Sequence, residues 1–409
     1  MIHIRHIFYS SIMTKPTVKF KRPSGRQPVI VQILPALVRG GVERGTVEMA
    51  KAIQTAGGHA VVISNGGPLV RHIERCGGKH IALPVHVKNP LRWPGLRRQL
   101  RAIFQTEGAD IVHVRSRVPA WLALNLAKSM GIATISTVHS RFTSTSFLKR
   151  RYNAKLLDAG QVIAISDYVH GLITSQYIGV EDRLTVVHRG VDTVTFDPAA
   201  VSQARIINFA DSVALPEDVP VIMMPARSSS WKGHHILLDA LAKLTDLRFV
   251  CLFVGASDGK AGFVKDITDY AQARGLEGRF RLTPVVDDMP AALMVADVVV
   301  MPSVTPEPFG RVALEAQAMG RPIVAFAHGG AVESIEHEKT GWLATPGDAD
   351  NLAENLRAAL SLQPRARKAY AHNARAHIEA HFSTDQMCQE TLKIYRRMLA
   401  KNQKNRAAR

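Results

Sequence analysis

The stretch Pro306-Glu307-Pro308-Phe309-Gly310-Arg311-Val312-Ala313-Leu314-Glu315-Ala316 follows a β-branched apolar run and leads into a helical pattern. A buried strand, a short loop and a helix in this order are typical of an α/β unit with a parallel sheet. The two prolines hold Glu307 in the loop, and Gly310 lets a ligand approach the backbone closely. We predict a helix over residues 312–319, and the N–H groups at its start, near Arg311 and Val312, have no partner within the helix and suit a phosphate. The stretch therefore predicts a ligand site at the end of a parallel strand.

Two carboxylates accompany this predicted phosphate site, Glu307 in the loop and Glu315 on the helix. A carboxylate accepts hydrogen bonds from vicinal hydroxyls, so two of them beside a phosphate indicate a ligand with two hydroxylated rings. A nucleotide sugar is such a ligand. The spacing alone favours a plainer alternative, in which Glu307 is a loop charge and Glu315 is a solvated helix residue.

The same alternation of short apolar runs and longer amphipathic segments fills two consecutive parts of the chain. In the first part we predict strands over residues 29–34, 60–64, 110–114, 133–138, 161–165 and 184–188, and in the second over 221–224, 248–254, 280–283, 298–301 and 322–326. Two such units in tandem form a cleft, and ligands of open parallel sheets bind outside the carboxyl ends of the strands. The fold class is therefore α/β.

The composition between and around these units predicts the domain limits. We expect a disordered basic extension over residues 1–27, with Met13 as an alternative start, then a first Rossmann-like domain over 28–195 and a connector over 196–219. A second Rossmann-like domain is expected over 220–383. Residues 384–409 are expected to form a helix that crosses back to the first domain and ends in a basic tail.

Over a longer stretch, PEPFGRVALEAQAMGRPIVAFAHGGAVESI, the chain resembles the signature of the retaining glycosyltransferases of family 4, and the similarity spans residues 29–399. Glu307 and Glu315 stand at the E-x7-E spacing of that family. The resemblance implies that Glu307 binds hydroxyls of the donor sugar, that Glu315 binds the ribose hydroxyls, and that the backbone at Phe309 and Gly310 contacts the sugar. It also implies the GT-B fold, in which two Rossmann-like domains face each other across a cleft.

A second match directly follows the first predicted strand of the second unit. Pro225-Ala226-Arg227-Ser228-Ser229-Ser230-Trp231-Lys232-Gly233 resembles the R-x4-K-G element of the same family, whose cations neutralise the donor diphosphate. The resemblance assigns that role to Arg227 and Lys232, and two fixed cations stabilise a departing diphosphate without a metal. We therefore expect no metal and no cofactor besides the donor, a UDP- or GDP-sugar. Ser228 departs from the family pattern, which has an apolar residue there.

Two further matches lie in the first unit. Gly40-Gly41-Val42-Glu43-Arg44 resembles the GG-x-E-R loop, which implies that Gly40 and Gly41 bring the backbone close to the donor phosphates and the acceptor. His139, at the end of a predicted strand, resembles the family histidine that contacts the donor sugar, although Ser140 replaces the usual glycine. A lone histidine at a strand end is otherwise a packed, hydrogen-bonded residue.

The reaction that the resemblance implies is transfer of a hexosyl group to a hydroxyl with retention of the anomeric configuration. The acceptor attacks the front face, and the leaving phosphate oxygen takes its proton. Glu307, Arg227, Lys232 and His139 would stabilise an oxocarbenium-like transition state.

Composition excludes several other classes of protein. With 409 residues, 46% apolar residues and 21% charged residues, the chain can bury large cores, so it is neither disordered nor fibrous. No run approaches the roughly 18 apolar residues of a membrane span, so we expect a cytoplasmic protein. Three widely spaced cysteines favour neither disulfides nor a zinc site.

The net charge of +18 (52 − 34) is unevenly distributed. Residues 71–160 carry 16 Lys and Arg against four acids, a net charge of +12, whereas residues 161–390 carry 20 against 28, a net charge of −8. Only 6% of the residues are aromatic, which argues against a nucleic-acid partner. The basic segment instead favours an anionic acceptor.

Within the basic segment, Leu96, Leu100, Ile103 and Phe104 recur at helical spacing and leave the arginines at 97, 98 and 101 on another face. Arg115 and Arg117 follow a predicted strand, and we expect them at the cleft mouth. With the basic run at 149–151, these cations indicate peripheral contact with the inner membrane surface. The HVRSRVPAW and KNP segments resemble enzymes that build the lipopolysaccharide core or related envelope glycans.

Three other functions stay open. The acceptor could be soluble, such as a sugar phosphate, which a basic surface also suits. A two-domain NAD-dependent oxidoreductase would require G-x-G-x-x-G after its first strand, which this chain lacks. The most remote alternative is a nucleotide-sugar binding protein without catalysis.

Overall fold

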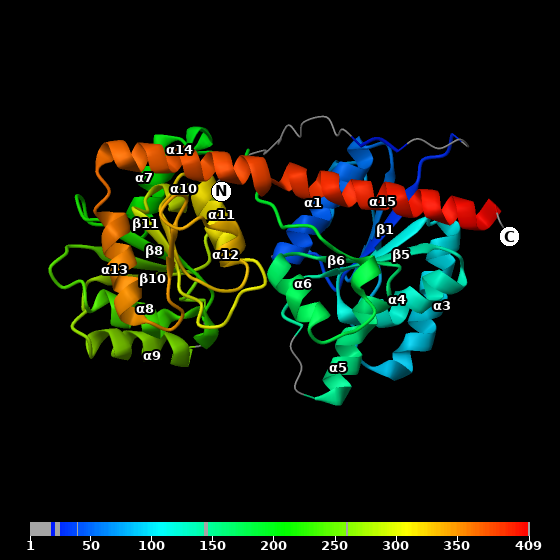
Figure 1. Cartoon of the computed structure of the whole chain (residues 1–409), viewed down its shortest axis with the longest axis horizontal. Coiled ribbons are helices and arrows are strands. Elements are labelled where there is room, and N and C mark those ends of the chain that lie inside the picture. The colour runs from blue at the N-terminus through cyan, green and yellow to red at the C-terminus, as the bar shows by residue number, and fades with distance from the viewer. Residues whose placement is uncertain (1–17, 21–24, 39, 143–145, 259–260, 408–409) are drawn as a thin grey trace, which may run out of the picture. The chain divides into compact units, whose positions relative to one another are not determined.

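The computed structural model describes residues 18–20, 25–38, 40–142, 146–258 and 261–407, with side chains described up to residue 404. The chain forms two compact units (Figure 1). Among the described residues, the N-terminal unit comprises residues 18–189 and 384–407, and the C-terminal unit comprises Gly190–Ser383. The fold class is α/β, with a parallel sheet in each unit, as expected from the alternating pattern.

The N-terminal unit is built on a seven-stranded parallel sheet in the order β3-β2-β1-β4-β5-β6-β7. Its strands are β1 (Val29–Ile33), β2 (His59–Ser64), β3 (Lys79–Ala82), β4 (Ile111–Val114), β5 (Ala133–Val138), β6 (Gln161–Ala164) and β7 (Leu184–Val186). β1, β4 and β5 are completely buried, because a parallel sheet covered by helices has no solvent face.

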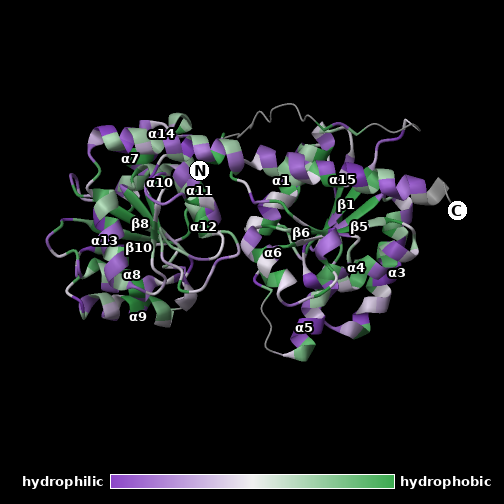
Figure 2. Ribbon diagram, in the orientation of Figure 1, coloured by the Kyte–Doolittle hydropathy of each residue, from purple (hydrophilic) through white to green (hydrophobic). Residues whose placement is uncertain are grey.

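Helices cover this sheet. They are α1 (Gly41–Thr55), α2 (Val70–Arg75), α3 (Trp93–Thr106), α4 (Arg117–Ser129), α5 (Phe147–Ala154) and α6 (Asp167–Thr174), with short 3₁₀ turns η1 (Pro90–Arg92), η2 (Lys155–Asp158) and η3 (Glu181–Arg183). On α3, Leu96, Leu100 and Phe104 are buried, which confirms the face predicted from their spacing. Each helix carries both polar and apolar residues, while the strands are mostly apolar (Figure 2).

The C-terminal helix α15 (Thr384–Ala407) packs on the N-terminal unit, lying along α1 and contacting β4 and β5 (Figure 1). Its Tyr395 is completely buried, and the Tyr395 hydroxyl lies 2.7 Å from Nδ1 of His113 on β4. Nε2 of His113 in turn lies 2.7 Å from the Thr137 hydroxyl of β5. The expected return of this helix to the first domain is confirmed.

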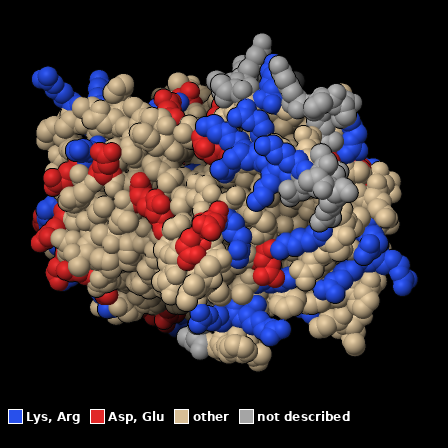
Figure 3. Space-filling view, turned by 45° about the vertical axis from the view of Figure 1, so that its right-hand side comes forward, with Lys and Arg blue, Asp and Glu red and all other residues tan. Residues whose placement is uncertain are grey.

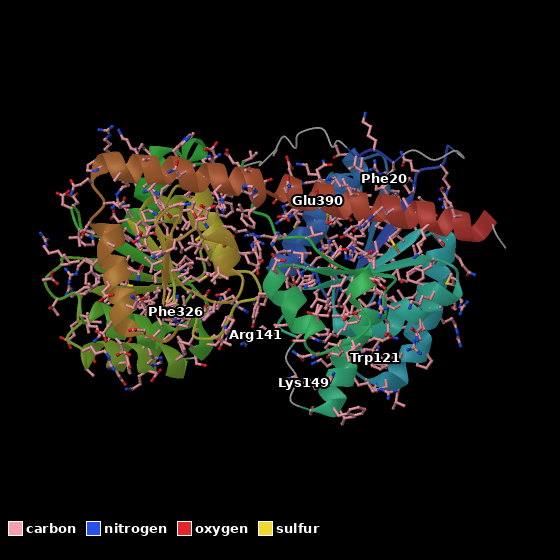
Figure 4. All side chains as sticks on the ribbon, in the orientation of Figure 1. Phe20, Trp121, Arg141, Lys149, Phe326 and Glu390 are labelled. Carbon is pink, nitrogen blue, oxygen red and sulfur yellow. The ribbon has the colours of Figure 1, made fainter. Side chains whose placement is uncertain are left out.

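The expected disorder of residues 1–27 does not hold where the structure describes this segment; residues 1–17 and 21–24, including Met13, lie outside the described part. Val18 is buried, and the Phe20 N–H donates to the Ala56 carbonyl beside α15 (Figure 4). Arg26 pairs with the buried Asp110 at 3.2 Å. Composition suggested a solvated tail, but two apolar side chains in this segment pack against the core.

The C-terminal unit contains a six-stranded parallel sheet in the order β10-β9-β8-β11-β12-β13. Its strands are β8 (Val221–Pro225), β9 (Val250–Val254), β10 (Phe280–Thr283), β11 (Val298–Met301), β12 (Ile323–Phe326) and β13 (Trp342–Ala344). The helices are α7 (Gln203–Ser212), α8 (His234–Leu241), α9 (Ala261–Gln272), α10 (Met289–Met294), α11 (Arg311–Ala318), α12 (Ala331–Ser334), α13 (Ala349–Leu360) and α14 (Pro364–His381), with 3₁₀ turns η4 (Pro198–Ala200) and η5 (Ser230–Lys232).

Residues 196–219 are not the connector that their Pro- and Asp-rich composition suggests. They include α7, which packs on α10, and Arg205 of α7 pairs with Asp288 at 2.6 Å. Phe196 and Phe209 are buried. The apolar face of α7 makes this segment part of the C-terminal unit, and the division between the units falls after Arg189 rather than near residue 195.

In the described part of the chain, no helix has both the length and the apolar character needed to cross a membrane.

Candidate functional site

The C-terminal sheet has its topological switch between β8 and β11, which are neighbours. From β8 the chain proceeds outward to β9 and β10, and from β11 it proceeds in the other direction to β12 and β13. In open parallel sheets, ligands bind at the carboxyl ends of the two strands that flank such a switch. The loops at this position are residues 226–233 after β8 and residues 302–310 after β11, and both motifs of the second unit lie in them.

Lys232 and Glu307, one from each of these loops, form an ion pair. Lys232 Nζ donates to Glu307 Oε1 at 2.7 Å, and the Ser303 hydroxyl donates to the same oxygen at 2.5 Å. The two charged side chains are 15% and 12% exposed. Lys232 Nζ also lies 4.2 Å from the centre of the Trp231 ring. Two sequence motifs separated by 75 residues therefore meet at one carboxylate.

Close backbone packing holds the two loops together. Gly233 has φ +86°, and a Cβ at this position would lie 1.8 Å from the Pro302 carbonyl oxygen. The Val304 N–H donates to the Trp231 carbonyl at 2.9 Å. Only glycine adopts the left-handed conformation readily and lets the Pro302 carbonyl come this close to its Cα. The packing of the two loops therefore explains the glycine that ends the R-x4-K-G element.

A third loop, after β12, packs against the backbone of Glu307. The Gly330 N–H donates to the Glu307 carbonyl at 3.0 Å. A Cβ on Gly329 would lie 2.4 Å from that carbonyl oxygen, and a Cβ on Gly330 would lie 2.3 Å from Cα of Phe309. Three loops from adjacent strands therefore position Glu307.

Two helices begin at these loops without a side-chain cap. α8 starts after Gly233, and α11 starts after Gly310, which has φ +88°. A helix N-terminus carries unpaired N–H groups and a partial positive charge, which suit an anion. In the first turns of α11, Arg311 Nη2 pairs with Glu315 Oε1 at 3.2 Å, and Val312 is half-buried. Phe309 is buried, with its ring centre 6.0 Å from that of Phe382.

No contact among the described residues joins Arg227 to the Lys232–Glu307 pair. Its side chain is exposed and makes no hydrogen bond or ion pair with the described residues, although it lies on the same loop as Lys232. Ser228, which departs from the family pattern, donates from its hydroxyl to the Ala256 carbonyl after β9. A hydrogen bond therefore holds the Ser228 side chain in its loop.

The only Asp-x-Asp sequence of the chain lies elsewhere in the unit. Asp348 caps α13 by accepting from the N–H groups of Asp350 and Asn351, and Asp350 pairs with Lys243 at 2.6 Å. Both carboxylates are thus accounted for by local structure.

In the N-terminal unit the topological switch lies between β1 and β4. The loop after β1 ends at Gly40 and Gly41, where α1 begins, and the Gly41 carbonyl accepts a hydrogen bond from Arg189 Nη2. The Glu43 carboxylate lies over Gly40, since a Cβ there would be 2.2 Å from Glu43 Oε2. These glycines therefore bring bare backbone to the carboxyl edge of the sheet.

His139 follows β5 at the same edge of the N-terminal sheet. Neither ring nitrogen has a hydrogen-bond partner among the described residues, and both are buried. Burial lowers the pKa of His139 well below its ordinary value, and the charges of Arg189 and Arg115 lower it further. The imidazole is neutral near pH 7, so it can exchange hydrogen bonds with a sugar hydroxyl but does not supply a positive charge.

Arg115 and Arg117, which we expected at the mouth of the cleft, are held by contacts within the N-terminal unit. Arg115 is 6% exposed, and burial lowers its pKa, while a hydrogen bond with Tyr395 of α15 raises it. Arg117 Nη2 donates to the Ser140 hydroxyl at 2.9 Å, and its Nε donates to Asn153 Oδ1 at 2.5 Å. Arg117 therefore ties the loop that carries His139 to α5.

Sequence reasoning missed three groups that support these residues. Ser303 bonds to Glu307, the Gly329-Gly330 pair packs under it, and the Arg117–Ser140 contact holds the residue after His139. A glycine pair directly after a predicted strand could have indicated the second group. No sequence pattern marks the other two, because each depends on residues brought together by the fold.

Comparison with known proteins places both units in one family. Residues 39–195 match the family model described as Glycosyltransferase Family 4, and residues 206–377 match the model described as Glycosyl transferases group 1. A glycosyltransferase of known structure from Rickettsia africae is 33% identical, with a TM-score of 0.84, and the match covers 91% of this chain and 99% of that one.

Two further relatives match over nearly their whole length. The D-inositol 3-phosphate glycosyltransferase of Jonesia denitrificans is 28% identical over 412 residues, which cover 91% of each chain. The Anabaena protein HepE, solved in complex with UDP-glucose, shares the fold at 24% identity and a TM-score of 0.78, with 90% of this chain and 99% of that chain covered. These matches leave no place for the oxidoreductase alternative. The chain belongs to the GT-B glycosyltransferases of family 4 and is an enzyme that transfers hexosyl groups.

Proposed function

We propose that this enzyme transfers a hexosyl group, with retention and without a metal, from a nucleoside-diphosphate sugar to a hydroxyl of an envelope glycan or glycolipid such as the lipopolysaccharide core. The observation that carries the proposal is the largely shielded Lys232–Glu307 pair between two uncapped helix N-termini at the switch of the C-terminal sheet. A cation and two helix N-termini suit a diphosphate, and a carboxylate among them suits sugar hydroxyls.

In this mechanism Lys232 and the start of α8 stabilise the charge that develops on the leaving diphosphate, and Arg227 swings in from solvent to join them. Glu307 holds hydroxyls of the donor sugar, Glu315 holds the ribose, and the backbone from Phe309 to Val312 lies against the donor. The acceptor hydroxyl attacks the face from which the diphosphate leaves, and the leaving phosphate oxygen takes its proton.

We assign the acceptor to the carboxyl edge of the N-terminal sheet. The neutral His139 and the backbone of Gly40 and Gly41 provide hydrogen-bonding groups there, and the Glu43 carboxylate over Gly40 adds an acceptor for hydroxyl groups. Lys and Arg gather over the N-terminal unit (Figure 3), which supports an anionic acceptor and peripheral contact with the cytoplasmic face of the inner membrane.

A soluble sugar phosphate is the second candidate acceptor. It is favoured by the likeness to the Jonesia denitrificans protein, whose name specifies D-inositol 3-phosphate. The same basic unit suits a phosphate monoester, so the charge does not distinguish the two acceptors.

The experiment begins with the donor. A thermal-shift panel of UDP- and GDP-sugars identifies the nucleotide sugar that stabilises the protein, because stabilisation grows as RT ln(1 + [L]/Kd). Transfer from that donor to lipopolysaccharide core acceptors and to inositol phosphates is then measured by proton NMR, which also gives the anomeric configuration. An inverted product contradicts the proposed mechanism, and transfer only to the soluble phosphates selects the second candidate.

A further inference from the structure

The surface of α3 and α4 contains a basic pocket. Three arginines of α3 line an open pocket of about 470 Å³ with small polar and apolar residues of the two helices, and the complete lining is Pro94, Arg97, Arg98, Arg101, Asn125, Leu126 and Ser129. The lining includes no acid. Arg98 and Arg101 are exposed and have no ion-pair partner among the described residues.

A row of aromatic rings runs from this pocket to α5. The ring centres of Trp93 and Trp121 lie 6.1 Å apart, and those of Trp121 and Tyr152 lie 6.5 Å apart. Arg97 Nη2 donates to the Trp121 carbonyl at 2.8 Å, which joins the pocket to the row. Trp121 and Lys149 lie on this part of the unit (Figure 4). The pocket, the rings and α5 therefore form one continuous surface.

The start of α5 combines exposed apolar side chains with cations. Phe147 is 76% exposed and Leu148 is 78% exposed, and the exposed basic run at 149–151 follows them directly. The Tyr177 hydroxyl donates to the Arg150 carbonyl at 3.1 Å, which brings Ile178, 98% exposed, to the same end of the helix. Single exposed apolar residues are ordinary, but three at one helix end beside a basic run are not.

We propose that this surface, which we call the docking face (the pocket, the three rings, Phe147–Arg151 and Ile178), binds the anionic headgroups of a lipid bilayer. The pocket takes a headgroup phosphate, because guanidinium groups bind phosphate oxygens through paired hydrogen bonds. Phe147, Leu148 and Ile178 enter the interfacial layer, where tryptophan and tyrosine rings are also favoured.

Charge and shape together favour a bilayer over other anions. A nucleic acid would engage the cations and the faces of aromatic rings, but the Trp121 ring stacks on Tyr152 and lies tilted against Trp93. Exposed apolar residues at a helix end gain nothing from a nucleic acid, whereas the bilayer interface accepts them. A basic pocket and an apolar tip also supply the two signals that stable peripheral binding needs. The inference rests on the membrane location proposed above and not on the donor chemistry.

The test is co-sedimentation of the full chain with vesicles of phosphatidylglycerol and phosphatidylcholine, compared with phosphatidylcholine alone. The variant R97E/R98E/R101E is expected to bind the anionic vesicles at least about tenfold more weakly. F147S/L148S is expected to bind about tenfold more weakly with an unchanged salt dependence, because it removes apolar rather than charged contacts. R365E/K368E, at exposed positions of α14 in the C-terminal unit, is a charge-reversal control that lowers the net charge by four units against six, and it is expected to bind like wild type.

The neutral variant R97Q/R98Q/R101Q and thermal denaturation of every variant guard against misfolding. Donor affinity by calorimetry is expected to be unchanged in all of them, so loss of vesicle binding with intact donor affinity supports the inference. If both arginine variants bind vesicles as well as wild type does, the pocket does not bind the headgroups and the inference is refuted. Equal loss in the α14 control shows that net charge alone binds the vesicles and also overturns it. Failure of the donor site would appear instead as lost donor affinity with vesicle binding intact.

Discussion

Replacing Glu307 by glutamine is the sharpest test of the donor site, because the change keeps the shape of the side chain and removes its charge. We expect Glu307→Gln to lower kcat/KM at least about 100-fold, which corresponds to about 2.7 kcal/mol of lost transition-state stabilisation. The protein is expected to stay folded, since Glu307 lies in a loop and not in an apolar core.

The size of the effect follows from the contacts of one oxygen. Glu307 Oε1 accepts from Lys232 Nζ at 2.7 Å and from the Ser303 hydroxyl at 2.5 Å. Hydrogen bonds to charged groups contribute about 1.5–3 kcal/mol each, and both charged side chains here are largely shielded from water. Glutamine leaves Lys232 without its carboxylate, so the cation beside the diphosphate loses its fixed position.

The assay is donor consumption with kcat and KM determined separately, beside donor affinity by calorimetry. Lys232→Ala is expected to lose as much as Glu307→Gln. Ser303→Ala removes one hydrogen bond and keeps the ion pair, so it is expected to lose about tenfold, less than Glu307→Gln. Lys339→Ala is the matched control for Lys232, because Lys339 is 77% exposed and its pair with Glu336 lies at 3.6 Å, where an ion pair contributes little. Near-wild-type turnover by a folded Glu307→Gln protein refutes the assignment of this carboxylate to the donor site.

Four further measurements test other parts of the structure. Activity is expected to persist in excess EDTA, and full loss restored by magnesium or manganese contradicts the metal-independent mechanism. Burial lowers the pKa of His234 from the ordinary 6.5 to about 4, so the unfolded state binds a proton at a higher pH than the folded state does. Urea titrations should therefore show about 2 kcal/mol of unfolding free energy lost between pH 7 and pH 5, and a smaller loss in His234→Phe. Equal losses in the two proteins would show that His234 is not the cause. Tyr395→Phe leaves Nδ1 of His113 unpaired and should lower the unfolding free energy of the N-terminal unit by about 1–3 kcal/mol, measured by urea denaturation; an unchanged midpoint argues against that bond. Gly233→Ala forces a Cβ against the next loop and should abolish donor binding in calorimetry, while unaltered affinity would show that the loops separate freely.

Periodicity predicted every central strand of the two sheets but only two of the four edge strands, β7 and β10. The predicted limits of the central strands β5 and β11 match the structure, because buried strands of a parallel sheet are continuous apolar runs bounded by turn residues. β3 and β13 were missed, and both lie at sheet edges. β3 reads Lys-His-Ile-Ala with both ends exposed, so its strand conformation comes from pairing with β2 and not from its own pattern.

The candidate site divides in the same way. The motifs around Glu307 and Lys232 were visible in the sequence because their glycines, prolines and charges occur at fixed local spacing. The contacts of Arg115 and Arg117 could not be predicted, because a position at the end of a strand fixes the backbone of a residue but not the groups of other elements that its long side chain reaches.

The sequence by itself therefore determined the two α/β units, the identity of the donor motifs and the family, since each depends on local pattern. Only the tertiary structure decided that Lys232 meets Glu307 and that Tyr395 reaches His113, residues that are 75 and 282 positions apart. Such pairs depend on which strands are neighbours and on how closely their loops pack. The order of the strands in each sheet is set by the burial of whole strands and helices, and no single motif contains that information.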